Sequence, residues 1–294
     1  MTPHPDRVAG VSTPAWTPST YEFLQAAPPG PSFERTWPVR TGDVDPGRRV
    51  RLDGIARYLQ DMANDEMFHR GFDATDPYWL VRRSIIDVHE PLHWPSDVTL
   101  LRWCESTSSR WCNMRITLRG SAGGHVETEA FWIRFSADSG MPTHISEGGM
   151  EYLQQHVTET RLRWKALNTA TPPEPSARDY TVKLRATDFD PYQHLNNAAY
   201  LQLVEDDLNG DPLLAAPHRA IIEYLAPIPL GSSVQVRSER DEAGYRQWLH
   251  LLDADGAPAR KPAAAVSVTP LPGAPFAPPA PWPPEQVERI EWRA

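Results

Sequence analysis

One order of predicted elements occurs twice along the 294 residues, and this repetition limits the folds open to the chain. The first copy begins with a strand from Trp37, a turn at 41–47 and a helix whose apolar residues recur every three or four positions from Leu52 until Gly71 ends it. Four strands follow, predicted at 79–89, 98–106, 111–119 and 126–136. In the second copy we predict a strand at 180–184, a helix at 197–208 and strands at 219–225, 233–240, 245–252 and 263–269.

Residue matches support the repeat. A shift of 145 positions (188 minus 43) places Asp43-Val44-Asp45-Pro46 on Asp188-Phe189-Asp190-Pro191 without a gap, and Asp61 on Asp206. A shift of 136 positions (223 minus 87) places Asp87, Pro91 and Ser96 on Glu223, Pro227 and Ser232. A strand, one long helix and several antiparallel strands form an α+β unit in which a curved sheet wraps the helix. Two such units can pair at their sheet edges as a pseudo-dimer.

We divide the chain into five parts on this basis. They are a proline-rich tail at 1–34, a first repeat at 35–146, a linker with a short helix (150–157) at 147–176, a second repeat at 177–270 and a second proline-rich tail at 271–294. The two tails have a composition that buries too little apolar surface to offset the entropy of ordering.

Composition excludes several classes of function. The net charge of −9 argues against non-specific binding to nucleic acid or to an anionic membrane. No apolar run approaches the roughly 18 residues of a membrane span, and no signal peptide is recognisable. Two cysteines, Cys104 and Cys112, fit a reducing compartment, although one bridge within a hairpin stays open. We therefore expect a cytoplasmic protein. Glu66 and His69 fall short of a metal site, so we expect neither a metal nor a cofactor.

The stretch from Asp188 to Asn197 is the densest in groups able to do chemistry. It contains two carboxylates, one histidine and two asparagines between a predicted strand and a predicted helix. Under the shift of 145, the first copy has Arg49 in place of His194, and Arg51 and Leu52 in place of the two asparagines. An aspartate is present in both copies, so the second copy is the better equipped.

These features resemble those of hot-dog fold acyl thioesterases: a strand ending in Asp-x-Asp-Pro, a helix wrapped by an antiparallel sheet, and the later strand Ile-Glu-Tyr-Leu-Ala-Pro at 222–227. The tandem arrangement is similar to the bacterial type of the acyl-acyl carrier protein thioesterase family over residues 35–270. Residues 59–64, with Gly71-Phe72 and 79–81, are similar to that family's first helix and the following strand. Residues 190–197 are similar to its catalytic loop, commonly written Asp-x-Asn-x-His-x-Asn-Asn.

The resemblance implies an activity, the hydrolysis of fatty acyl thioesters of acyl carrier protein or coenzyme A to free fatty acid and thiol, as part of fatty acid biosynthesis. It places the family's aspartate on Asp190, its histidine on His194 and its asparagine on Tyr192, which is a departure. The Glu-Cys pair of the plant members would fall on Pro227 and Ile228 and is absent. An aspartate-based mechanism is therefore implied.

A thioester hydrolase needs an activated water or a carboxylate nucleophile, and donors aimed at the oxyanion. We expect Asp190 to act as base or nucleophile, and the first N–H groups of the second-repeat helix to form the oxyanion hole. His194 would orient water, donate to the oxyanion or tune Asp190. Asn196 or Asn197 would cap the helix or hold the thioester carbonyl.

The first repeat would then hold the acyl chain. The residues proposed to line an apolar slot are Ile55, Leu59, Met62, Trp79, Ile85 and Trp132, with an ordinary core as the alternative. We expect a monomeric pseudo-dimer or a homodimer.

Two other functions stay open. An inactive acyl-thioester-binding or scaffold protein is suggested by Tyr192, Pro227 and Ile228. A double hot-dog enoyl-thioester hydratase or dehydratase is suggested by residues 41–46, which are similar to that family's Gly-Asp-x-Asn-Pro-x-His loop, although Arg48 holds the histidine position.

Overall fold

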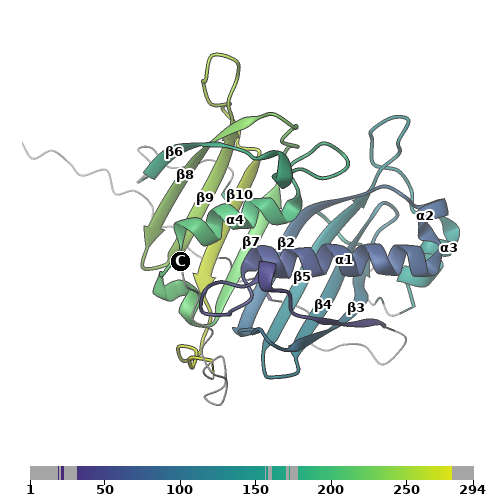
Figure 1. Cartoon of the computed structure of the whole chain (residues 1–294). Helices are drawn as coiled ribbons and strands as arrows, with labels where there is room; N and C mark the ends of the chain where they lie inside the picture. Colours follow the sequence, from purple (N-terminus) through teal and green to yellow (C-terminus); the bar gives the residue numbers. More distant parts are fainter. Residues whose placement is uncertain are drawn as a thin grey trace, which may run out of the picture.

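The computed structural model describes residues 19, 21–22, 32–155, 157, 161–169, 172 and 178–279. Their strands form one antiparallel sheet in the order β1-β3-β4-β5-β2-β7-β10-β9-β8-β6 (Figure 1). The strands are β1 (Phe33–Pro38), β2 (Trp79–Glu90), β3 (Asp97–Thr107), β4 (Trp111–Gly120), β5 (His125–Arg134), β6 (Arg178–Lys183), β7 (His218–Tyr224), β8 (Ser233–Asp241), β9 (Gly244–Leu251) and β10 (Ala264–Pro270). The α-helices are α1 (Leu52–Arg70), α2 (Phe72–Thr75), α3 (Glu147–Leu153) and α4 (Asn197–Asp207). Short 3-10 turns occur at η1 (Thr41–Asp43), η2 (Ala186–Asp188) and η3 (Pro212–Ala215).

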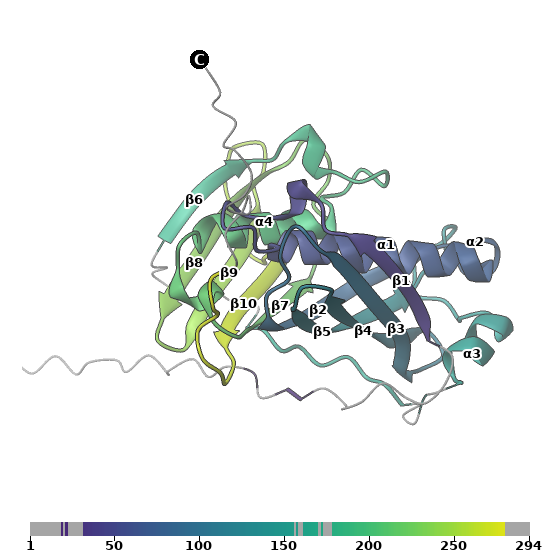
Figure 2. The same ribbon diagram turned by 60° about the horizontal axis from the view of Figure 1, so that its bottom comes forward.

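The two repeats share one sheet. Strands β1 to β5 come from the first repeat and β6 to β10 from the second, and they meet where β2 pairs with β7. Both long helices lie on the same face of the sheet, α1 over the first half and α4 over the second (Figures 1 and 2). At the seam, the Asp87 carboxylate accepts two hydrogen bonds of 2.6 Å from the guanidinium of Arg219. This is the α+β architecture of two sheet-wrapped helices that the sequence predicts.

The turn before each helix has the same backbone in both repeats. Within the described ranges, two non-glycine residues have positive φ: Arg48 (69°) and Gln193 (61°), which the shift of 145 (193 minus 48) relates. The bridge between Val44 and Val50 has its counterpart between Phe189 and Leu195. Two different sequences thus adopt the same turn conformation before the helix.

Two elements differ from their predicted limits. The linker helix, expected at 150–157, runs from Glu147 to Leu153, because the Ser146 hydroxyl caps it by accepting a 3.1 Å hydrogen bond from the Gly149 N–H. The first strand begins at Phe33 and not at Trp37, since Phe33 pairs with Arg102 of β3 and is 3% exposed. Helix α1 ends at Gly71 as predicted, in the left-handed conformation with φ 72°.

The chain between the repeats crosses the outer face of the sheet at residues 161–169 (Figure 2). The Arg83 guanidinium donates to the Lys165 carbonyl, and the Glu223 carboxylate accepts from the N–H groups of Leu167 and Asn168. The charged side chains of β2 and β7 on this face are thereby hydrogen-bonded under the crossing segment. Glu223, one position before Tyr224, anchors this segment.

Both expected tails lie mostly outside the described residues, and their boundaries stay a prediction. Among the parts described, the Tyr21 hydroxyl donates to Glu129 at 2.7 Å, and the Phe276 N–H donates to the Ala215 carbonyl at 2.8 Å. Cys104 and Cys112 are buried and free, so the hairpin bridge left open above is not formed. Among the described residues no helix is long and apolar enough to cross a membrane, and no three metal-ligating side chains of the described ranges cluster.

One buried histidine makes stability depend on pH. Burial of the His218 ring lowers its pKa to about 4. Its Nδ1–H donates to the Ala216 carbonyl at 2.8 Å, and its Nε2 is buried without a partner among the described residues. The unfolded chain takes up a proton near the ordinary value of 6.5 while the folded ring stays neutral, so this contribution is complete above that pH and is lost as the pH falls.

We expect this group to lower the free energy of unfolding by about 2 kcal/mol between roughly pH 6.5 and pH 5. The variant His218→Asn keeps a donor toward Ala216 but takes up no proton, so its acid slope should be flatter by that amount. Urea unfolding of both proteins at several pH values measures the difference, and equal slopes would contradict the assignment.

Candidate active site

The loop before α4 holds the Asp190 carboxylate in one orientation. Its Oδ1 accepts hydrogen bonds from the backbone N–H groups of Tyr192 at 2.9 Å and His194 at 3.2 Å. The Asp190 N–H in turn donates to the His194 carbonyl at 2.9 Å. Oδ2 has no partner among the described residues, and Asp190 lines a cavity. The backbone thus holds one oxygen of the carboxylate and leaves the other without a partner among the described residues.

The start of α4 supplies a free donor beside this carboxylate. Asn196 is the N-cap: its Oδ1 accepts from the Ala198 N–H at 2.9 Å. No group of the described ranges accepts from the N–H of Asn197, the first helical residue, and Asn197 lines the same cavity as Asp190. The capping role, one of two open for the asparagines, therefore falls to Asn196, which does not line the cavity. The helix N-terminus favours a developing negative charge at Asn197.

His194 and Tyr192 lie on the outer side of the loop. Both line the cavity, and the His194 ring has no hydrogen-bond partner among the described residues. The side chain of Tyr192 is 67% exposed, so it forms part of the rim. Of the five residues expected in the catalytic site, four thus line one cavity: Asp190, Tyr192, His194 and Asn197.

The cavity is a slot of about 650 Å³ that extends from this loop into the first repeat. Helix α1 covers it with a stripe at spacings of three and four residues: Gln60, Ala63, Asn64 and Met67. The sheet forms its floor from Tyr224 on β7 through Trp79 on β2 and Trp132 on β5 to Cys112 on β4 and Arg102 on β3. From β7 to β3 is four strand spacings, or about 19 Å along the sheet.

The structure places two of the six residues expected to line an apolar slot at this cavity. Trp79 and Trp132 line the slot, whereas Ile55, Leu59, Met62 and Ile85 do not. Those four are at most 9% exposed and belong to the interior. The reason is the rotation of α1, because its most apolar stripe packs inward and the neighbouring, more polar stripe that begins at Gln60 faces the slot.

Charged residues close the far end of the slot, which the sequence analysis did not foresee. Arg102 forms an ion pair with Glu66 of α1, and the other Glu66 oxygen accepts from the Tyr152 hydroxyl of α3 at 2.5 Å. All three residues line the slot. The linker helix therefore forms the end wall. No sequence signal connects these residues, which come from a helix, a strand and the linker.

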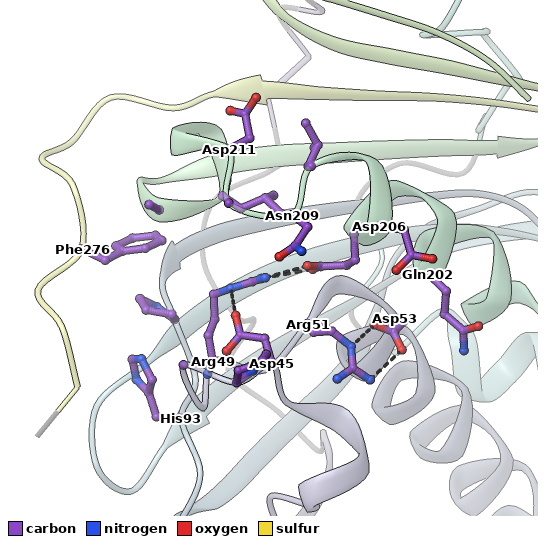
Figure 3. Close-up of a pocket in the computed structure, with 18 of the residues that line it drawn as sticks. Asp45, Arg49, Arg51, Asp53, His93, Gln202, Asp206, Asn209, Asp211 and Phe276 are labelled. Atoms are coloured by element: carbon purple, nitrogen blue, oxygen red, sulfur yellow. Dashed lines mark hydrogen bonds and ion pairs between the residues drawn. The ribbon is translucent and has the colours of Figure 1, made fainter. Parts of the chain in front are cut away.

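The matching site in the first repeat is closed. The Glu205 carboxylate of α4 accepts from the Leu52 N–H at 2.6 Å, which is the position corresponding to the Asn197 N–H. It also accepts from Arg49, the counterpart of His194, at 3.1 and 2.6 Å. Arg49 contacts the Asp45 carboxylate at 3.0 Å as well (Figure 3). A pocket of about 660 Å³ lies here, but the donors that would serve a ligand are already satisfied.

The residue that closes the first site, Glu205, has a counterpart in the open site. Under the shift of 145 (205 minus 60), Glu205 corresponds to Gln60, which lines the slot. Gln60 of α1 therefore corresponds to the residue of α4 that blocks the N-terminus of α1, but Gln60 is neutral. Extending the shift that matched Asp61 to Asp206 by one residue would have found this pair.

The fold defines a class of protein, the double hot-dog proteins, in which two sheet-wrapped helices share one sheet. The sequence models agree with this class: the acyl-ACP thioesterase N-terminal domain matches residues 30–153, and the acyl-ACP thioesterase C-terminal domain matches residues 172–264. The chain belongs to the acyl-acyl carrier protein thioesterase family, as its motifs predicted.

Sequence comparison finds relatives in bacteria and in plants. An uncharacterized protein of Mycobacterium tuberculosis is 36% identical over 219 residues, which are 74% of this chain and 86% of that protein. The chloroplastic oleoyl-acyl carrier protein thioesterase 2 of Arabidopsis thaliana is 25% identical over 225 residues, 69% of this chain and 60% of that protein.

Solved structures show the same fold. An acyl-ACP thioesterase from Bacteroides thetaiotaomicron superposes with a TM-score of 0.66 at 15% identity, over 80% of this chain and 96% of that one. The 12:0-ACP thioesterase from Umbellularia californica gives 0.64 at 14% identity, over 81% and 96%. The predicted tandem hot-dog fold is thereby confirmed.

Proposed function

We propose that this protein hydrolyses fatty acyl thioesters, with one active site at the loop from Asp190 to Asn197. One observation carries the proposal. A half-buried carboxylate with a free oxygen and a helix N–H without an acceptor face the same end of a long slot. The same two groups are blocked in the other repeat.

The roles of the residues follow from this arrangement. The acyl chain would lie under α1 with its thioester at Asn197, whose N–H donates to the carbonyl oxygen as it becomes an oxyanion. The free oxygen of Asp190 attacks the carbonyl carbon, or removes a proton from the water that does so. The carbon–sulfur bond then breaks and the thiolate leaves with little acid assistance, since a thiol pKa is about 8.5. Where Asp190 is the nucleophile, water hydrolyses the mixed anhydride that this leaves on Asp190, which releases the fatty acid and restores the carboxylate.

His194 and Gln60 complete the site in this proposal. The His194 ring lines the slot without a partner of its own among the described residues, so it can orient the water or donate to the oxyanion. Gln60 presents both a donor and an acceptor. Gln60 makes no hydrogen bond to the Asn197 N–H among the described contacts, whereas Glu205 accepts from the equivalent Leu52 N–H.

The alternatives have less support. The loop similar to a hydratase motif, residues 41–46, belongs to the closed repeat, where the Leu52 N–H is already bound by Glu205. A scaffold role gives no reason for a carboxylate and a free helix N–H to face the slot together. The acyl-ACP thioesterase family and the names of its plant members favour acyl carrier protein as the thiol carrier.

Release of free thiol from acyl-acyl carrier protein and from acyl-coenzyme A, followed with a thiol-reactive dye, tests the proposal. We expect release from both at saturating substrate, with the lower KM for the acyl carrier protein form. Water addition to an enoyl thioester without release of thiol would favour a hydratase. Tight acyl binding without turnover would favour a scaffold.

A further inference from the structure

The segment that crosses the outer face of the sheet carries exposed positive charge. No acidic residue occurs from 161 to 169, although the whole chain has a net charge of −9. The side chains of Arg163 and Lys165 are exposed and form no ion pair with any described residue. The glutamates beneath the segment, Glu129 and Glu223, are 1% exposed and hydrogen-bonded. The outward surface of the segment is therefore positive.

Trp164 holds this segment beside the open end of the slot. The centre of its ring lies 5.4 Å from the guanidinium carbon of Arg82 and 5.3 Å from that of Arg83. Arg82 lines the slot and donates hydrogen bonds to the carbonyls of Tyr224 and Leu225, which line it as well. The Arg82 side chain thus connects the lining of the slot to the crossing segment, and it adds a third positive charge there.

The rim of the open end is apolar and exposed. Tyr78, Leu80 and Tyr192 line the slot, and they are 42%, 45% and 67% exposed. Leu230 is 52% exposed and lies against the loop before α4, since its N–H donates to the Gln193 carbonyl at 2.9 Å. Exposed apolar side chains grouped around one opening are typical of a surface that binds a partner.

We propose that the apolar rim and a basic strip, formed by Arg82, Arg163 and Lys165, are the docking surface for an acidic carrier protein that delivers the acyl chain. The inference rests on the proposed function, because it assumes that the thioester enters beside Asp190. Opposite charges on the two surfaces would speed their encounter and fix their orientation.

The position of the charges favours a protein over the other anionic partners. Arg163 and Lys165 do not line the slot, so they can contact a partner that stays outside it while the acyl chain lies within. The two side chains are exposed and do not converge in this cavity, whereas a compact phosphate group is bound best by donors that converge on it. An anionic membrane would be repelled by a chain with a net charge of −9.

The test is Arg163→Glu combined with Lys165→Glu, assayed with one acyl group on acyl carrier protein, on coenzyme A and on neutral pantetheine. We expect KM for the carrier protein form to rise about tenfold with kcat unchanged, and KM for the pantetheine form to stay the same. KM of the unaltered protein for the carrier protein form should rise with ionic strength, and the variant should lose most of this dependence. An unchanged KM for the carrier protein form would overturn the inference, as would a rise with coenzyme A alone.

Arg260→Glu combined with Lys261→Glu is the matched control. Both residues are exposed between β9 and β10, and their reversal changes the net charge by the same amount. KM should stay the same for all three substrates. An equal rise for the carrier protein form would show an effect of net charge and not of a docking surface, which would refute the inference.

Sedimentation with vesicles of anionic phospholipid tests the membrane as partner. We expect no binding of the unaltered protein. Vesicle binding that the strip variant loses, with KM for the carrier protein form unchanged, would assign the strip to a membrane and overturn the inference.

The two proposals can fail separately, because calorimetric titration with the acyl carrier protein form measures docking apart from turnover. If no thioester is hydrolysed but the strip variant binds this form about tenfold more weakly, the thioesterase function is refuted and the docking surface stands. If the pantetheine form is hydrolysed and the strip variant acts on the carrier protein form as well as the unaltered protein does, the docking surface is refuted and the function stands.

Discussion

Asp190→Asn is expected to lower kcat for thioester hydrolysis by about a thousandfold. The amide oxygen can still accept the two backbone hydrogen bonds that now reach Oδ1, so the loop should keep its structure. What is lost is the negative charge on the other oxygen, which the nucleophile or base requires. Steady-state thiol release measures kcat, and an unchanged unfolding midpoint shows that the fold is intact.

The repeat provides a matched control. Asp45 occupies the corresponding position in the closed site, where its carboxylate pairs with Arg49 at 3.0 Å. Asp45→Asn weakens this pair and should cost about 1 kcal/mol of stability while leaving kcat unchanged. A similar fall of kcat in both variants would show that the effect is structural. Undiminished hydrolysis in Asp190→Asn would refute the mechanism.

The fold could be predicted because its signals are local or repeated. Helical periodicity and Gly71 fixed the extent of α1. The shift of 145 related two loops whose backbones have the same positive φ at Arg48 and Gln193. The position of Asp190 at the head of the second helix followed from the same comparison, and the structure places it with His194 and Asn197 on one cavity.

The lining of the slot depends on packing that no local pattern records. Whether Leu59 or Gln60 faces the slot depends on the rotation of α1 between the sheet and α4, which the apolar stripe alone does not give. The pair of Arg102 and Glu66 joins a strand to a helix, with each residue alone in its segment. From the sequence alone, a single charged residue is expected at the surface. Only the folded structure shows that these two are buried.

The closing of the first site is likewise a long-range event with a large energetic consequence. Arg49 and Glu205 are 156 residues apart, and the Glu205 side chain is 7% exposed. Its removal in Glu205→Ala leaves the buried Leu52 N–H without an acceptor and Arg49 with Asp45 alone. We expect the free energy of unfolding to fall by about 3 kcal/mol, with kcat for thioester hydrolysis unchanged.

The related position in the open repeat should respond in the opposite way. Gln60→Ala removes no ion pair, so stability should change by at most about 0.5 kcal/mol. Because Gln60 faces the slot beside the catalytic loop in the proposed mechanism, kcat/KM should fall about tenfold. Urea unfolding and thiol release on both variants give the comparison.

Loss of activity in Glu205→Ala at a temperature where it stays folded would mean that the first site takes part in catalysis. No loss in Gln60→Ala would remove Gln60 from the mechanism. In that case this helix position would matter only for access to the helix N-terminus: Glu205 blocks the N-terminus of α1, and Gln60 leaves that of α4 open.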